Sequence, residues 1–113
     1  MTITIDEFKK LDIRIGHILT VEKVPETDKL LKLSVNFGDE NPRQIVSGIA
    51  GFFPDIQTLV GKKCAFAYNL EPRTIRGLES EGMILAVNGE TAGKSFFSLL
   101  ETSDDVTPGS GVK

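Results

Sequence analysis

The stretch Leu30 to Ser47, with the sequence LLKLSVNFGDENPRQIVS, decides the fold. Its first half alternates apolar and polar residues, and the apolar side is made of Leu31, Leu33, Val35 and Phe37. That two-residue period is typical of a strand with one buried face. Gly38 to Pro42 gathers turn-forming residues, and a second strand pattern follows them. The stretch therefore predicts two antiparallel strands, Leu30 to Phe37 and Arg43 to Ser47, joined by a hairpin turn.

The segment before this hairpin changes from a helical to a strand pattern. Thr4 and Glu7 have the spacing of a capping box, so we expect a short helix that continues through Leu11. From Asp12 onward every second residue is expected to face the core, namely Ile13, Ile15, His17, Leu19 and Val21. This pattern predicts a long, half-buried first strand.

Four more segments follow the hairpin. Gly48 to Gly61 contains a short helical pattern and is predicted as a helical connection. Lys63 to Asn69 is predicted as a fourth strand, and Glu71 to Gly82 as a long polar loop. Met83 to Val87 is dense in apolar residues, so we expect a fifth strand that is covered on both faces.

The last part of the chain is predicted as a turn, a strand and a tail. Asn88-Gly89 is a strong turn signal, and Phe96 to Leu100 is expected to close the sheet. Pro108 to Gly111 is expected to form a turn or a frayed end. Three strands, a helical connection, two strands and an extension are the element order of the oligonucleotide-binding (OB) fold, an all-β, five-stranded Greek-key barrel. The length of 113 residues fits a single domain, 1–113.

Composition argues against several classes of protein. One cysteine, Cys64, and one histidine, His17, provide neither a disulfide nor the ligands of a structural zinc ion. The chain has neither a secretory signal pattern at its start nor an apolar run of about 20 residues, so we expect a cytoplasmic protein without membrane contact. We find no catalytic motif and no cofactor-binding motif. The net charge of −3 disfavours nucleic acid unless basic residues gather on one face.

Four colinear segments resemble the tRNA-binding domain family. They are NLEPRTIRGLESEGM (69–83), FKKLDIRIG (8–16), DKLLKL (28–33) and IVSG (45–48). Members of this family are appended to bacterial methionyl-tRNA synthetases, occur in a synthetase-associated cytokine precursor, and exist as free-standing structure-specific tRNA-binding proteins. The resemblance implies an OB barrel that binds the outer corner of folded tRNA without catalysis. It also implies a homodimer, either free-standing or acting as part of methionyl-tRNA synthetase.

The candidate RNA-binding residues come from both the pattern and the resemblance. Arg73 and Arg76 share one loop, and a guanidinium offers a planar pair of donors for phosphate oxygens. The alternative to phosphate binding is that both arginines are ordinary solvated residues of a surface loop. The resemblance adds Asn69, Ser80 and Met83, although Met83 taken alone is a better candidate for the core. Residues on or beside the expected binding strands complete the set: Lys29, Lys32, Arg43 and Ser47.

Two other functions stay open at this point. One branch of the same family resembles secretion-associated chaperones, which implies a dimer that binds peptides. A small enzyme that uses Cys64 is the third possibility, but Cys64 lies on the same side of its strand as Phe66 and Tyr68, where cysteine behaves as a small apolar residue.

Overall fold

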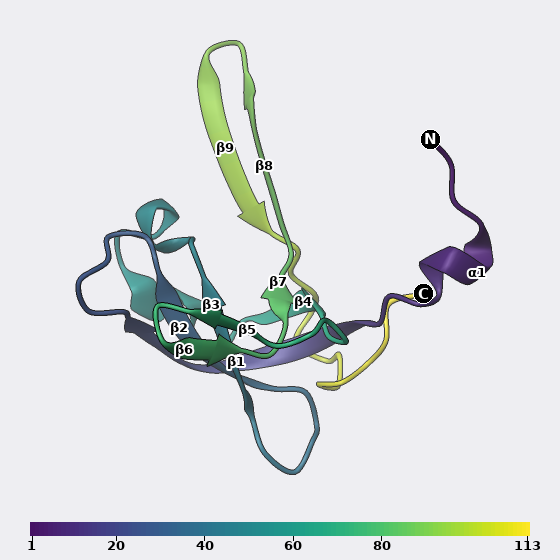
Figure 1. Cartoon of the computed structure of the whole chain (residues 1–113). Coiled ribbons are helices and arrows are strands. Elements are labelled where there is room, and N and C mark those ends of the chain that lie inside the picture. The colour runs from purple at the N-terminus through teal and green to yellow at the C-terminus, as the bar shows by residue number, and fades with distance from the viewer.

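A computed structural model describes all residues, 1–113, and shows an all-β protein with small helical parts. Figure 1 shows a curled sheet, from which a hairpin and the N-terminal segment extend. The helical elements are α1 (Ile5–Phe8) and the 3-10 helices η1 (Ala50–Phe52) and η2 (Ile56–Leu59). The strands are β1 (Ile13–Lys23), β2 (Leu31–Asn36), β3 (Arg43–Ser47), β4 (Lys63–Ala67), β5 (Arg73–Ile75), β6 (Leu78–Ser80), β7 (Met83–Ile84), β8 (Ala86–Thr91) and β9 (Lys94–Leu99).

The main sheet has five antiparallel strands in the order β3-β2-β1-β4-β7. The long strand β1 is shared: its first half pairs with β4 and its second half with β2. Sharing one strand between two neighbours coils the sheet and brings its edges together, and β7 lies against β3. The curled five-strand sheet forms a half-barrel of the OB type, so the predicted fold class is confirmed.

Strand β1 contains a bulge that the sequence pattern did not predict. The pairing with β2 runs from Ile18 opposite Val35 to Thr20 opposite Ser34, so Leu19 is the extra residue. An extra residue reverses which side chains face inward. Ile18 and Val21, on the two sides of the bulge and three residues apart, are therefore both buried, while Leu19 is 38% exposed. The expectation that Leu19 faces the core was wrong for this reason.

The core lies inside the curled sheet and follows the predicted side of β2. Its apolar cluster comprises Ile18, Val21, Leu31, Leu33, Val35, Phe37, Ile45, Ile49, Leu59, Cys64, Phe66, Ile84 and Leu99. Gly16 is required at the crossing of β1 over β2, because a Cβ there would lie 2.4 Å from a methyl of Val35. Burying these side chains is the main stabilising term of the barrel.

The region after β4 differs from the sequence-based expectation in four ways. The predicted closing strand, Phe96 to Leu100, lies largely in β9, which pairs with β8 in a separate two-stranded sheet and does not join the main sheet. The predicted loop 71–82 contains the hairpin β5–β6. The predicted fifth strand stops at Ile84, and Val87 is 46% exposed on β8. Asn88 and Gly89 are not a turn: they lie in β8, paired with Phe97 and Phe96. The turn occurs instead at Ala92-Gly93, where both residues have positive φ, as a two-residue type I′ turn requires.

Both chain ends lie on the same side of the barrel (Figure 1). Thr4 and Glu7 form the predicted capping box, but α1 ends at Phe8 and not at Leu11. The C-terminal tail is a turn and not a frayed end. It pairs with the start of β1, since the amide N–H of Gly109 donates to the Ile15 carbonyl at 2.7 Å and that of Val112 to the Ile13 carbonyl at 2.8 Å.

Candidate nucleic-acid interface

The hairpin β5–β6 lies beside the edge strand β3 and is held there by hydrogen bonds. The Gln44 side-chain amide donates to the Glu79 carbonyl at 2.9 Å, and the Glu81 N–H donates to the Gln44 carbonyl at 2.9 Å. Strand β6 therefore runs antiparallel to β3, and the hairpin tip points past Ser47. Because backbone groups of β3 are occupied in this way, the edge is covered.

The hairpin tip carries Arg76 in a conformation that few side chains adopt. Arg76 and Gly77 have φ values of 52° and 79°, so they form the centre of a type I′ turn, where Asn-Gly is the usual pair. A residue other than Gly, Asn or Asp in this region carries a modest conformational cost. The turn therefore presents an exposed arginine at a position where a smaller residue would be more favourable.

A cavity of about 450 Å³ lies between the tip and the loop after β1. Arg76 lines one side, and Glu26, Thr27, Asp28, Lys29 and Leu30 line the other. The loop is anchored, since the Ala50 N–H donates to the Lys29 carbonyl at 3.0 Å. Fold topology thus brings two predicted residues, Lys29 and Arg76, to one cavity although they are far apart in sequence.

A second cavity, of about 410 Å³, lies at the base of the hairpin. It is lined by Leu70, Glu71, Pro72, Arg73, Ser80, Gly82 and Met83. Met83 is 44% exposed, so its thioether lies on the surface and not in the core. The structure therefore brings Arg73 and Met83 together, and the core alternative for Met83 was wrong.

The guanidinium groups of Arg73 and Arg76 are not engaged by the acidic residues near them. The ion pairs of the chain within 4.0 Å are Arg14–Asp12, Lys32–Glu22, Arg43–Asp39 and Lys62–Glu101. Arg73 and Arg76 belong to none of these pairs, and both residues are exposed. Their donors are available to a ligand.

The side chains of Ser80 and Asn69 hold the backbone, and Ser80 is buried while Asn69 is exposed. Ser80 is 2% exposed; its hydroxyl accepts from the Val46 N–H at 3.0 Å and donates to the Gly82 carbonyl at 3.1 Å. The Asn69 amide accepts from the Asp12 N–H at 2.8 Å and donates to the Lys10 carbonyl at 2.7 Å. Direct contact of these two side chains with RNA stays a prediction.

The remaining predicted residues lie along β2 and β3. Lys32 and Arg43 line a polar cavity of about 320 Å³ together with Thr20, Glu22, Leu33, Ser34, Pro42 and Gln44. Lys32 forms an ion pair with Glu22 at 3.0 Å, which reduces its attraction for phosphate. Ser47 is half-buried at the end of β3 and pairs with Leu31.

Sequence reasoning missed Gln44, which bonds to the hairpin, and Tyr68, which precedes it in the chain. Gln44 binds the hairpin backbone as described above. The Tyr68 hydroxyl donates to an Asp39 carboxylate oxygen at 2.6 Å, and this hydrogen bond raises the pKa of Tyr68 above its ordinary value. A partly exposed tyrosine at the end of an apolar strand was the one available signal, since such a residue needs a partner for its hydroxyl.

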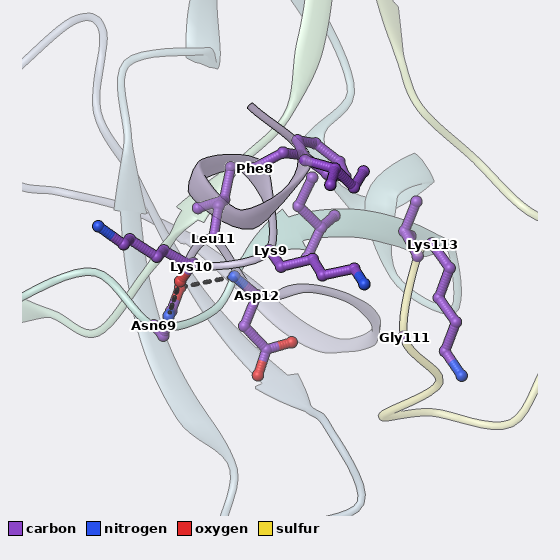
Figure 2. Close-up of a pocket in the computed structure, with 11 residues that line it drawn as sticks. Phe8, Lys9, Lys10, Leu11, Asp12, Asn69, Gly111 and Lys113 are labelled. Atoms are coloured by element: carbon purple, nitrogen blue, oxygen red, sulfur yellow. Dashed lines mark hydrogen bonds between the residues drawn. The ribbon is translucent and has the colours of Figure 1, made fainter. Parts of the chain in front are cut away.

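The largest cavity, of about 540 Å³, lies away from the hairpin, between α1 and the C-terminus (Figure 2). Apolar side chains form much of its wall: Ile5, Phe8, Leu11, Ile13 and Val112. Figure 2 also shows Lys9, Lys10 and Lys113 around it, and the Asn69 side chain bonded to the backbone of Lys10 and Asp12. This cavity is an apolar surface with a basic rim.

Cys64 and His17 do not form a reactive pair. Burial raises the pKa of the Cys64 thiol to about 11, so the group stays protonated at neutral pH and is a poor nucleophile. No three of the His, Cys, Asp and Glu side chains are grouped as metal ligands. None of the helices has the length and apolarity needed to cross a membrane.

Residues 13–111 match the family described as "Putative tRNA binding domain". The chain belongs to the tRNA-binding domain family. The methionine–tRNA ligase of Lactococcus lactis is 45% identical over 109 residues, which cover 96% of this chain and 16% of the ligase. The crystal structure of a MetRS-related protein from Pyrococcus horikoshii superposes with a TM-score of 0.84 at 38% identity, covering 100% of this chain and 99% of that one.

A chaperone shares the same architecture. The CsaA chaperone protein of Picrophilus torridus superposes on this tRNA-binding domain with a TM-score of 0.79 at 29% identity, covering 99% of this chain and 100% of that one. The curated ligases, by contrast, are much longer than the region they share with it, and the chain spans 12–16% of their length. The shared region is thus the tRNA-binding domain and not the catalytic part of the ligase.

Proposed function

We propose that this protein is a non-catalytic, single-domain module that binds folded tRNA through hairpin β5–β6 and the loop that faces its tip. The observation that carries the proposal is the pair of exposed, unpaired guanidinium groups of Arg73 and Arg76 on a hairpin fixed to the barrel edge. A planar guanidinium can donate two hydrogen bonds to one phosphate. Family membership supports tRNA as the nucleic acid.

The character of the surface favours recognition of shape over sequence. No aromatic ring lines either hairpin cavity. Their exposed groups are Lys29, Arg73, Arg76 and Met83, together with the carboxylates of Glu26, Asp28 and Glu71. Sequence-specific binding of single-stranded RNA depends on bases stacked on aromatic rings. Two arginines held on one anchored hairpin, with carboxylates beside them, suit the fixed phosphate spacing of a folded RNA.

The net charge of −3 does not oppose this proposal, because several acidic groups lie elsewhere. Glu101 pairs with Lys62 at 3.1 Å. Lys63 donates to the carbonyl of Val106 at 2.8 Å, which folds the acidic segment 101–105 against β4. The fields of these charges are screened within about 10 Å at ordinary salt concentration. Phosphate attraction therefore depends on the geometry of Arg73 and Arg76, because Glu71, Glu79 and Glu81 lie near them in the sequence and repel phosphate.

We propose that hairpin β8–β9 packs against a second copy of the chain. This hairpin projects from the barrel (Figure 1), and every residue of β8 is exposed. Phe96 lies across Gly89 with 46% of its surface exposed. Two-stranded hairpins are marginally stable alone in water. Exposed apolar residues on the N-terminal segment, Ile3, Ile5 and Phe8, offer a complementary apolar surface, which supports a homodimer.

We infer that the protein acts in the cytoplasm during translation, either free-standing or as part of methionyl-tRNA synthetase. The likeness to methionine–tRNA ligases over most of the chain supports this role. In that setting the module would raise the local concentration of tRNA near its partner enzyme. No cofactor enters such a mechanism.

A competition experiment tests the proposed function. Whole tRNA and an unstructured RNA of equal length are compared in gel-shift titrations at two salt concentrations. We expect tRNA to bind more tightly at both, and affinity for both RNAs to fall as salt rises, because phosphate contacts release counterions. Equal affinity for the two RNAs would contradict shape recognition, and no binding at low salt would contradict the function itself.

Peptide binding of the chaperone type is the second candidate function. The exposed apolar surface of hairpin β8–β9 and the likeness to a CsaA chaperone favour it. In the same titrations, an unfolded apolar peptide is added at rising concentration. If tRNA is the ligand of the hairpin β5–β6 cavities, the peptide leaves the tRNA complex intact. Binding of the peptide to a chain that shows no affinity for tRNA would support the chaperone alternative.

A further inference from the structure

A side chain from another strand joins the two ends of the segment that contains hairpin β5–β6. We call these two ends, at Tyr68 and Glu81, the neck of the hairpin. The Arg43 guanidinium on β3 donates through Nη1 to the Tyr68 carbonyl at 2.8 Å and to the Glu81 carbonyl at 3.4 Å. Tyr68 and Glu81 flank the segment 69–80, which contains the whole hairpin. One donor atom therefore ties together the two ends of the hairpin segment.

The position of the Arg43 guanidinium is fixed by three further contacts. Its central carbon lies 3.6 Å from the centroid of the Tyr68 ring and 5.9 Å from that of Phe37. Its Nε lies 3.8 Å from an Asp39 carboxylate oxygen, which also accepts the Tyr68 hydroxyl at 2.6 Å. Stacking, charge and a shared acceptor together restrict the group to one geometry, and 26% of the side chain is exposed.

From these contacts we propose that Arg43 is a positioning residue for RNA binding, which acts by fixing the neck of hairpin β5–β6 and not by contacting phosphate. A hairpin held in its bound geometry avoids the ordering cost that a mobile one would incur on binding. The RNA half of this inference rests on the proposed function of the hairpin. The other part of the inference, that Arg43 closes the neck of the hairpin, does not depend on any ligand.

Arg14 supplies a matched control. Its guanidinium carbon also lies over the Tyr68 ring, 4.0 Å from the centroid. Its hydrogen bonds, however, go to the Asp12 carboxylate at 3.0 and 3.1 Å and not to either side of the hairpin neck. Arg14→Gln therefore removes the same charge from the same ring and leaves the neck closed.

The test measures amide hydrogen exchange and tRNA affinity in Arg43→Gln, Arg43→Lys and Arg14→Gln. For both Arg43 variants we expect amides of 73–80 to exchange about tenfold faster or more, while those paired between β1 and β2 keep wild-type rates. Arg14→Gln leaves the hairpin amides unchanged. Lysine keeps the charge but lacks the planar stacking group, so Arg43→Lys does not restore protection.

A double-mutant cycle tests whether Arg43 acts through the hairpin arginines. We expect Arg43→Gln to lower tRNA affinity about tenfold in the wild-type background and less than about twofold when Arg73 and Arg76 are already alanine. Equal losses in the two backgrounds, or full affinity in Arg43→Lys, would overturn the positioning role. If wild type binds no tRNA, the proposed function fails by itself, and unchanged exchange at the hairpin would overturn the neck closure separately.

Discussion

Two hairpins with the same turn chemistry, β5–β6 and β8–β9, have different surroundings. Each turns at a pair of positive-φ residues with glycine second, Arg76-Gly77 in one and Ala92-Gly93 in the other. The first lies against β3 and receives a hydrogen bond from the Gln44 side chain. The second projects from the barrel (Figure 1) and is anchored through Phe97, which stacks on Phe52 at 4.1 Å between ring centroids.

The two hairpins share a turn type but differ in how they are anchored and in which side chains they expose. We infer that these two differences determine the role of each hairpin. Hairpin β5–β6 combines polar anchoring with exposed cations, which suits a charged ligand that must find them in place. Hairpin β8–β9 combines free strand edges with exposed apolar groups, which suits a protein surface. We therefore propose RNA at the first and a second copy of the chain at the second.

The largest expected effect concerns hairpin β8–β9. Phe96→Asp places a charge where the proposed dimer buries an aromatic ring, and an unpaired buried charge is strongly unfavourable. We expect sedimentation velocity to show a dimer for wild type and a monomer for the variant at about 10 µM. Because two linked binding surfaces reinforce each other, tRNA affinity should also fall by about tenfold or more.

Ser95→Asp is the control for this change. It adds the same charge one residue away, on the opposite face of the same strand. We expect the Ser95 variant to remain a dimer. A monomeric wild type, or a Phe96→Asp variant that remains dimeric, would contradict the proposed interface.

A smaller effect compares the two turns directly. Asparagine tolerates positive φ better than arginine or alanine, so Arg76→Asn and Ala92→Asn should each leave the free energy of unfolding unchanged or raise it by less than about 1 kcal/mol. Only Arg76→Asn should weaken tRNA binding, by about tenfold, since a charge-assisted hydrogen bond is lost. Thermal unfolding and gel-shift titration of the two variants give the comparison.

Equal tRNA affinity in these two variants would mean that Arg76 is an ordinary surface residue. Loss of stability in both would mean that the turns are not held in the type I′ conformation.

Much of the barrel follows from the sequence because its pattern is local. Strand β3 has the predicted bounds, and β2 buries the predicted side, since alternation along a strand needs no tertiary information. The bulge at Leu19 and the turn at Ala92-Gly93 were not predicted, because both depend on pairing partners. Asn88-Gly89 forms no turn since Gly89 lies opposite Phe96, whose ring occupies the space of a side chain there.

The candidate site was predictable only in part for a similar reason. Residue type and resemblance are enough to select Arg73, Arg76 and Lys29 as candidates. They do not reveal that the Ser80 hydroxyl is used by the Val46 amide or that Arg43 bridges two carbonyls, because these partners are far away in sequence. A polar residue in a family segment can hold the backbone or contact the ligand, and only its geometry distinguishes the two.

The most direct test of the central claim is the salt dependence of tRNA binding by the Arg73→Ala/Arg76→Ala double variant. If both guanidinium groups neutralise phosphates, the slope of log affinity against log salt becomes shallower by about 1.5 relative to wild type. The control Lys94→Ala/Lys113→Ala makes the same change in net charge at exposed residues outside the two hairpin cavities. Because both lysines lie near the proposed dimer surface, sedimentation velocity first verifies that the control remains a dimer, and it should then keep the wild-type slope. An unchanged slope in the arginine variant, or an equal change in the lysine control, would contradict the account.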